Sequence, residues 1–169
     1  KKIVLELGGS DPFIVLNDAN IKKASKVAVS ARFFNAGQSC IAAKRFLVHE
    51  DIYDKFVESV KKHIENLQVG NPMDESTEIG PLAKKEFVNE LHSMVQSSIN
   101  DGARCLIGGK IDETAFYTPT LLTDVTKDME VFTKETFGPV FCIMKINNID
   151  EAIKMANNSQ YGLGGSIWT

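Results

Sequence analysis

The chain has 169 residues, of which 43% are hydrophobic and 24% are charged, and its formal net charge is −3. This composition is typical of one globular domain, and the acidic balance offers no basic surface for nucleic acid or for an anionic membrane. No apolar run approaches the roughly 20 residues of a membrane span. Three widely spaced cysteines, an odd number, indicate a reducing cytoplasm and suggest neither a disulfide framework nor a metal site.

The first apolar stretches of the chain flank a pair of glycines. Residues 3–7 form a β-rich run that contains Glu6 and is closed by Gly8 and Gly9, and residues 12–16 form a second run. The pattern predicts two short strands. Glu6 is therefore expected at the end of a strand, where α/β proteins often hold their catalytic groups.

A helix is expected next, and it leads to a cysteine. Its predicted N-cap is Asn20, and apolar residues of its buried face recur at helical spacing: Ile21, Ala24, Val27, Ala28, Ala31 and Phe34. Gly37 supplies the freer backbone that ends the helix near Asn35 and places Cys40 beside a loop. A tight loop can supply the backbone donors that a reactive thiolate needs. Spacing alone leaves open the alternative that Cys40 is a small buried hydrophobe.

The rest of the chain alternates predicted strands with predicted helices. Apolar patterns predict helices over 52–64, over 87–99 with Phe87 on the buried face, and over 149–156, and they predict strands at 46–49, 104–107, 118–122 and 140–146 and a last one that includes 167–169. The strands that carry Cys105 and Cys142 are expected to be buried, which would leave both thiols inert. Residues 71–81 and 135–139 are expected to be loops. This alternation predicts an α/β fold with a mainly parallel twisted sheet and flanking helices.

Four segments of the chain carry a family resemblance. Residues 35–40 (NAGQSC) resemble the nucleophile segment of the aldehyde dehydrogenase superfamily, and residues 5–9 (LELGG) resemble its general-base segment. The 34 positions that separate Glu6 from Cys40 also match the spacing in that family. Residues 135–139 (ETFGP) are similar to its cofactor-contact segment, and residues 161–168 (YGLGGSIW) are similar to a later signature. The four motifs occur in the order that the family keeps.

The resemblance implies a role for each of four residues. Cys40 would be the nucleophile that attacks an aldehyde carbonyl, with the backbone N–H of Cys40 among the donors that hold the oxyanion. Glu6 would activate the water that hydrolyses the resulting thioester. Glu135 would hold the nicotinamide ribose of NAD or NADP, and Phe137 would pack against the nicotinamide ring. Without the resemblance, Glu135 would be an ordinary loop carboxylate and Phe137 an ordinary core residue.

The resemblance also implies an organisation and a substrate. Residues 1–169 would be the catalytic domain of a longer enzyme, with the cofactor-binding domain and the oligomerisation strand outside this chain. The isolated chain is then expected to be inactive, and the full-length enzyme is expected to be a homo-oligomer. Within the superfamily, residues 6–16 most resemble the succinate-semialdehyde branch. Succinate semialdehyde is the predicted substrate, and another small aliphatic aldehyde is the alternative.

Two other functions remain as alternatives. A histidine among His49, His63 and His92 could activate Cys40 in a cysteine hydrolase, although the spacing selects none of them. The chain could also be a non-catalytic domain that only binds partners, but such a domain has no need of both Glu6 and Cys40. A substrate carboxylate would need a cation, and none of the arginines, Arg32, Arg45 and Arg104, is an obvious clamp.

Overall fold

A six-stranded sheet lies at the centre of the computed structural model, which describes residues 1–5, 7–111 and 113–169. The strand order is β3-β4-β5-β2-β1-β6, and every neighbouring pair is parallel except β3 with β4. The strands are β1 (Asp11–Val15), β2 (Ala43–His49), β3 (Arg104–Ile107), β4 (Thr120–Thr123), β5 (Val140–Ile146) and β6 (Ser166–Trp168). This sheet confirms the predicted α/β fold class.

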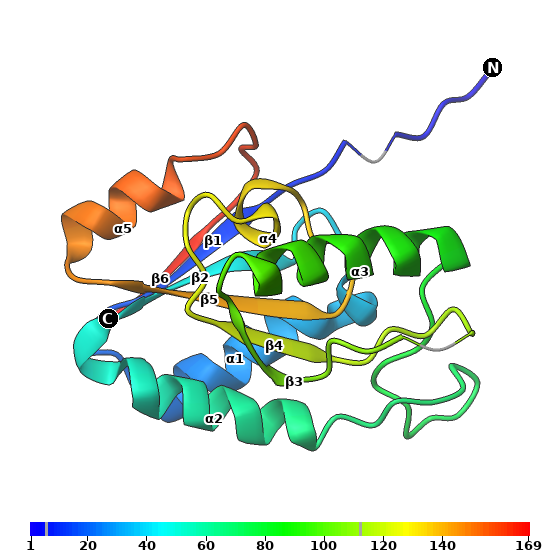
Figure 1. Ribbon diagram of the computed structural model, residues 1–169, viewed down its shortest axis with the longest axis horizontal. Coiled ribbons are helices and arrows are strands. Elements are labelled where there is room, and N and C mark those ends of the chain that lie inside the picture. The colour runs from blue at the N-terminus through cyan, green and yellow to red at the C-terminus, as the bar shows by residue number, and fades with distance from the viewer. Residues whose placement is uncertain (6, 112) are drawn as a thin grey trace.

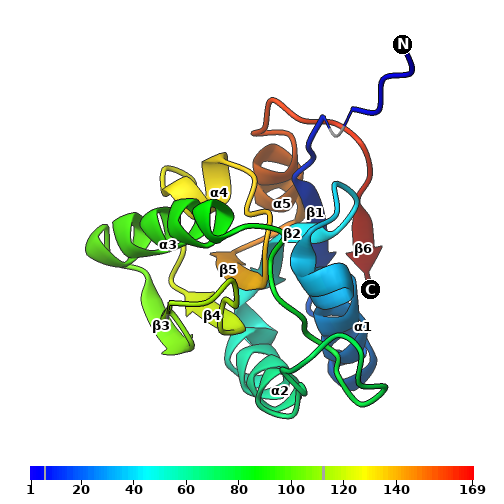
Figure 2. The same ribbon diagram turned by 90° about the vertical axis from the view of Figure 1, so that its right-hand side faces the viewer.

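Helices cover both faces of the sheet, as Figures 1 and 2 show. One face carries α1 (Ile21–Phe33) and α2 (Tyr53–Glu65), and the other carries α3 (Lys85–Asn100), α4 (Glu130–Thr133) and α5 (Ile149–Ala156). Two short 3₁₀ turns, η1 (Phe34–Gly37) and η2 (Glu50–Ile52), precede β2 and α2. None of the helices in the described residues is long and apolar enough to cross a bilayer.

The core lies on the two central strands, β2 and β5. Phe46 of β2 and Phe141 of β5 are fully buried, and their rings stack with centroids 3.6 Å apart. Both strands are covered by helices on each face, which is why 140–146 reads as an almost unbroken apolar run. The predicted N-cap of α1 is also confirmed, because the side chain of Asn20 accepts a hydrogen bond from the backbone N–H of Lys23 at 3.0 Å.

The buried face of α1 differs from the prediction. Val27 is 38% exposed and Phe34 is 68% exposed, whereas Arg32 is completely buried. The α-helix ends at Phe33, and Asn35 and Ala36 then take left-handed backbone angles, so the helical spacing does not extend to Phe34. A similar error affects α3, where Phe87 is 40% exposed.

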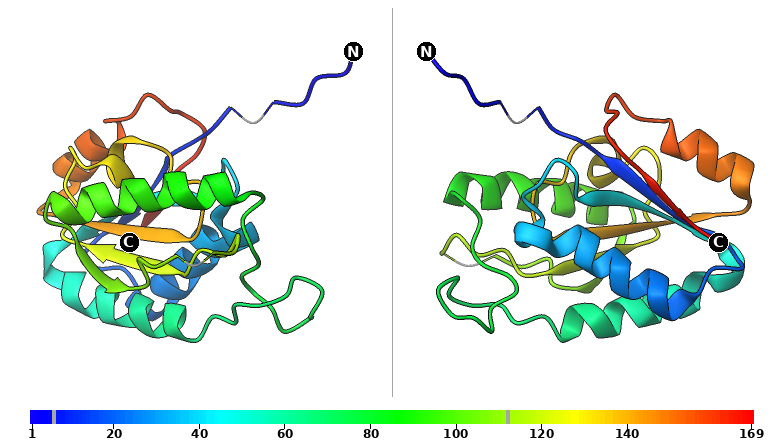
Figure 3. Two further views of the ribbon diagram at one scale, coloured as in Figure 1. Left: turned by 45° about the vertical axis from the view of Figure 1, so that its right-hand side comes forward. Right: turned by 180° about the vertical axis from the view of Figure 1, so that it is seen from behind.

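The predicted strand near the start of the chain is also wrong for the residues that can be described. Residues 1–5 and 7–10 form no strand, and the side chains of Ile3, Val4 and Leu5 are exposed. Both panels of Figure 3 show the start of the chain, residues 1–5, projecting from the body of the molecule, with no described strand beside it. An apolar run without a partner cannot form a ladder, whatever its propensity. Glu6 itself lies outside the described residues.

The second and third cysteines occupy different environments. Cys142 on β5 is fully buried, and burial raises the pKa of its thiol to about 11, so it remains protonated at neutral pH. The prediction of burial is wrong for Cys105, because β3 is an antiparallel edge strand and its residue is exposed. The Cys105 thiol donates a hydrogen bond to the carbonyl oxygen of Ile107 at 3.2 Å.

Candidate active site

Three motif segments meet at one end of the sheet, where the parallel strands β1, β2 and β5 begin. In the register of the sheet, Asp11 of β1 lies beside Ala43 of β2, and Arg45 of β2 lies beside Cys142 of β5. The residues just before these strands are therefore neighbours, although they are far apart in the sequence. The sequence analysis predicted a catalytic group, Glu6, at the end of a strand. In the structure, Cys40 and Glu135 instead lie just before β2 and β5.

The loop that carries Cys40 is held by its own hydrogen bonds. The side-chain amide of Asn35 donates to the carbonyl of Gln38 at 2.9 Å, and the backbone N–H of Gln38 donates to the carbonyl of Asn35 at 3.0 Å. Cys40 follows on a turn and is half-buried. Within the described part of the chain, the backbone N–H of Cys40 donates to no backbone acceptor.

Two glycines let neighbouring segments approach the Cys40 loop closely. A Cβ on Gly37, which has a φ of +75°, would overlap the carbonyl oxygen of Gly138. A Cβ on Gly9 would overlap the carbonyl oxygen of Cys40. The general-base segment and the cofactor-contact segment thus both touch the nucleophile segment through backbone atoms.

The side chain of Arg32 joins the same loops through buried hydrogen bonds. Its guanidinium is fully buried and donates to four backbone carbonyls: Gly37 at 2.8 Å, Gly138 at 2.9 Å, Ala43 at 3.0 Å and Thr136 at 3.1 Å. Burial lowers the pKa of Arg32 to about 10, so it stays charged at neutral pH. The Arg32 side chain, which the sequence analysis did not regard as an obvious substrate clamp, is part of the framework of the site.

Replacing Arg32 with methionine is expected to destabilise the protein by about 3 kcal/mol or more, because four buried carbonyls lose a charged donor. Chemical denaturation followed by circular dichroism measures the change. Arg104→Met is the matched control. Arg104 is exposed and forms a surface ion pair with Asp124 at 3.8 Å, so this substitution should lower the free energy of unfolding by less than about 1 kcal/mol. Equal midpoints for the two variants would contradict the role given to Arg32.

Arg45 is also committed to the framework. Its guanidinium donates to the carbonyls of Ser10, Met155 and Ala156 at 2.8–2.9 Å. It also lies 5.4 Å from the centre of the Phe132 ring. Neither buried arginine is therefore free to hold a substrate, which agrees with the expectation that no obvious clamp lies in this chain.

Lys44 joins the Cys40 loop to Glu135. Its ammonium is fully buried and lies 2.8 Å from the carbonyl oxygen of Ser39, 3.0 Å from that of Cys40 and 3.2 Å from that of Ala42. The same nitrogen is 3.1 Å from Oε1 of Glu135. Burial is the main cause that lowers the pKa of Lys44, and the charge of Arg32 adds to it, while Glu135 opposes both.

Glu135 also contacts the glycines that follow Glu6. Its Oε1 accepts a hydrogen bond from the backbone N–H of Gly9 at 3.0 Å. A Cβ on Gly8 would lie 2.5 Å from Oε2, and Gly8 has a φ of +83°, so this position requires glycine. The carboxylate is 16% exposed and is held in one orientation by an ammonium and an amide.

The fourth motif packs onto this corner as well. The backbone N–H of Gly164 donates to Oδ1 of Asp11 at 2.9 Å. Leu163 lies close to Gly9, where its Cδ2 would be 3.2 Å from an added Cβ. All four segments that carry the resemblance therefore meet at the end of the sheet where β1 and β2 begin.

The structure describes three of the predicted site residues, Cys40, Glu135 and Phe137. The backbone of Cys40 and the side chain of Glu135 are brought together, since the carbonyl oxygen of Cys40 and the carboxylate of Glu135 both contact the ammonium of Lys44. Phe137 is half-buried on the same loop as Glu135. Sequence reasoning missed Lys44, because a lysine near the start of a strand is normally exposed and nothing in the local pattern marks it as buried.

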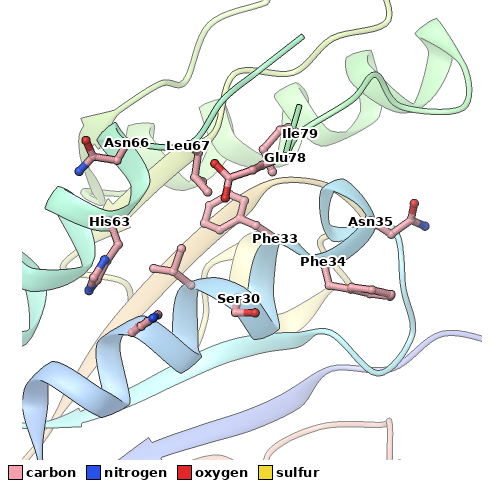
Figure 4. A pocket seen from close by; sticks show the side chains of 11 residues that line it. Ser30, Phe33, Phe34, Asn35, His63, Asn66, Leu67, Glu78 and Ile79 are labelled. Carbon is pink, nitrogen blue, oxygen red and sulfur yellow. The ribbon is translucent and has the colours of Figure 1, made fainter. Parts of the chain in front are cut away.

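A cavity of about 520 Å³ lies next to the Cys40 loop but contains neither Cys40 nor Glu135. Figure 4 shows it between α1, the end of α2 and the connection after α2, with His63 on its wall. Its lining residues are Lys26, Val29, Ser30, Phe33, Phe34, Asn35, His63, Asn66, Leu67, Glu78 and Ile79.

The histidines give the hydrolase alternative no support. Nδ1 of His49 lies 3.5 Å from Asp51, and Nδ1 of His92 lies 3.4 Å from the hydroxyl of Tyr117. Of the described residues, no histidine forms a hydrogen bond with Cys40.

Comparison with known proteins gives consistent matches. A sequence model of the aldehyde dehydrogenase family matches residues 1–169. The chain is 50% identical to a succinate-semialdehyde dehydrogenase [NADP(+)] of Mycobacterium avium (strain 104), over 100% of this chain and 36% of that protein. It is 47% identical to an aldehyde dehydrogenase of Paenarthrobacter nicotinovorans, over 37% of its length.

Solved structures show the same likeness in three dimensions. The succinate-semialdehyde dehydrogenase of Burkholderia pseudomallei superposes with a TM-score of 0.94 at 34% identity, over 100% of this chain and 36% of that chain. The lactaldehyde dehydrogenase of Escherichia coli superposes with a TM-score of 0.93 at 40% identity, over 97% and 35% of the two chains. The present chain therefore spans about a third of the length of the relatives it matches.

Proposed function

Because the chain belongs to the aldehyde dehydrogenase family, we propose that it is the catalytic domain of a longer NAD(P)-dependent enzyme that oxidises succinate semialdehyde to succinate. One observation carries the proposal. The half-buried Cys40 lies on a loop whose backbone shares the ammonium of Lys44 with the carboxylate of Glu135, since Lys44 contacts the carbonyl oxygen of Cys40 at 3.0 Å and Oε1 of Glu135 at 3.1 Å. A nucleophile and a cofactor-binding group are thereby held in one constellation.

Cys40 begins the proposed reaction. Its thiolate adds to the aldehyde carbon, and the carbonyl oxygen becomes an oxyanion that the backbone N–H of Cys40 stabilises. Oxidation of this adduct leaves a thioester on Cys40. Water activated by Glu6 then attacks the thioester carbon, the carboxylic acid departs, and the Cys40 thiolate is regenerated.

Glu135 and Phe137 fit a nicotinamide dinucleotide. When bound, this cofactor supplies the acceptor for the hydride that the adduct must lose. Glu135 is suited to the ribose hydroxyls because its carboxylate is fixed by Lys44 and Gly9 yet remains 16% exposed. Phe137, half-buried on the same loop, offers a ring for the nicotinamide. Among the similar proteins, the Mycobacterium avium relative carries NADP(+) in its name, and a solved structure from Sinorhizobium meliloti is named NAD-dependent.

The setting of the enzyme belongs to the same proposal. We place it in the cytoplasm as a homo-oligomer, with the cofactor-binding domain and the oligomerisation strand supplied by parts of the enzyme outside this chain. The cysteines support a reducing compartment, since Cys40, Cys105 and Cys142 are all free thiols. On this proposal, the isolated chain would not turn over substrate.

The substrate prediction is tested by comparing succinate semialdehyde with butanal in the full-length enzyme. A cation that binds the distal carboxylate should raise kcat/KM for the semialdehyde by roughly 10²-fold. Because Arg32 and Arg45 are occupied by backbone carbonyls, we expect that cation to come from outside this chain. Equal kcat/KM values would leave only an aldehyde dehydrogenase for small aliphatic aldehydes, which is the alternative.

A further inference from the structure

The burial of the Lys44 ammonium requires an explanation. A charged amine that is removed from water is costly unless each of its donors is satisfied. Here the compensation comes from three backbone carbonyls and one carboxylate, all within 3.2 Å. These acceptors come from two segments that are about 90 residues apart in the chain.

Mechanical support alone does not account for this arrangement. Arg32 already joins the same two loops, with bonds to the carbonyls of Gly37 and Gly138. All four hydrogen-bond acceptors of Arg32 are backbone atoms, however, whereas Lys44 also contacts the side chain of Glu135. The distinctive contact of Lys44 is thus with a group that we assign to cofactor binding.

Lys44 also controls the direction of the backbone N–H of Cys40. The carbonyl of Ser39 and the N–H of Cys40 belong to one peptide plane, and in a trans peptide they point in opposite directions. The shortest contact of the Lys44 ammonium, at 2.8 Å, is with that Ser39 carbonyl oxygen. Holding the oxygen fixes the plane and therefore fixes the direction of the N–H.

We propose that Lys44 is a positioning residue that orients two groups at once, the carboxylate of Glu135 toward the cofactor and the backbone N–H of Cys40 toward the oxyanion. This inference rests on the proposed function for the roles of Cys40 and Glu135. Without the ammonium, Oε1 of Glu135 keeps the N–H of Gly9 as its one partner among residues 1–5, 7–111 and 113–169, and the Ser39 peptide loses its charged restraint. Cofactor binding should then weaken, and the first chemical step should become slower.

The test uses Lys44→Met in the full-length enzyme, since methionine is of similar length and carries no charge. We expect the dissociation constant of the cofactor, measured by calorimetry, to rise about tenfold. The single-turnover rate of aldehyde oxidation at saturating cofactor should fall about tenfold or more. Alkylation of Cys40 by iodoacetamide needs no oxyanion donor, so its rate should change less than about twofold.

A double-variant comparison identifies the route of the effect. If Lys44 acts on the cofactor through Glu135, then Lys44→Met should not weaken binding further when Glu135→Gln is already present. Arg45→Met is the matched control, because Arg45 is equally buried and contacts neither Cys40 nor Glu135. It should lower the melting temperature and leave the cofactor dissociation constant unchanged.

The outcomes separate this inference from the proposed function. Wild-type cofactor affinity and single-turnover rate in Lys44→Met would overturn the inference. If Glu135→Gln alone leaves cofactor binding unchanged, the proposed role of Glu135 fails instead. Should Lys44→Met not fold, Lys44→Gln keeps one donor for the Ser39 carbonyl but no charge, and it should still weaken cofactor binding. Unchanged binding in Lys44→Gln would likewise overturn the inference.

Discussion

Replacing Cys40 with alanine is expected to lower kcat/KM for aldehyde oxidation by at least about 10⁴-fold in the full-length enzyme. The reason is that no covalent adduct can form without the thiol, so every later step is lost. The fold should persist, because Cys40 is half-buried on a turn and its carbonyl, which Lys44 holds, remains in alanine. The measurement is aldehyde-dependent formation of reduced cofactor, followed by absorbance.

The other two cysteines serve as controls for Cys40. Cys105→Ala and Cys142→Ala should each retain activity within about threefold, since neither residue belongs to the candidate site. Iodoacetamide should modify Cys40 well before Cys142, whose buried thiol has a pKa raised to about 11. Cys105 is the stricter comparison because it is exposed. Full activity in Cys40→Ala, or activity lost only when Cys105 is modified, would refute Cys40 as the nucleophile.

Replacing Glu6 with glutamine is expected to leave the first half of the reaction intact and to slow the second half by about 10²-fold or more. Water activation is needed only for the thioester, so oxidation of the first equivalent of aldehyde should proceed. Rapid mixing should then show a burst of reduced cofactor close to one equivalent per site, followed by a slow steady state.

Loss of the burst in Glu6→Gln would assign Glu6 an earlier role, such as deprotonation of Cys40. The matched control is Glu50→Gln, a carboxylate exposed on η2 and remote from the motif segments, which should behave as the wild type. A steady state as fast as the wild type in Glu6→Gln would remove Glu6 from the mechanism altogether.

The parts of the fold that could be predicted are those in which local pattern and burial agree. The run 140–146 became β5 because a strand covered on both faces needs apolar side chains at nearly every position. The amphipathic spacing of Phe56, Val60 and Ile64 likewise marked α2, and these three side chains are buried. The family resemblance also implied that segments near Cys40 and Glu135 belong to one site.

The parts that could not be predicted depend on tertiary partners. Residues 3–5 have strand propensity, but no described strand lies beside them. The burial of Arg32 depends on carbonyls that belong to loops up to 106 positions away. Lys44 appeared to be a charged residue at the start of a strand, because its partner Glu135 lies on a segment that precedes a different strand. A one-dimensional pattern shows which groups need partners, but the sheet register decides which partners they meet.

The meeting of the motif segments at the start of β1, β2 and β5 has a consequence for folding kinetics. The hydrogen bond between Gly9 and Glu135 closes a loop of 126 positions, so the site depends on some of the most non-local contacts in the chain. A slip of β5 by one residue would move Glu135 by about 3.3 Å, which is enough to separate it from Lys44. Collapsed intermediates with native-like helices would therefore lack the catalytic constellation, and recovery of activity should lag behind recovery of secondary structure during refolding.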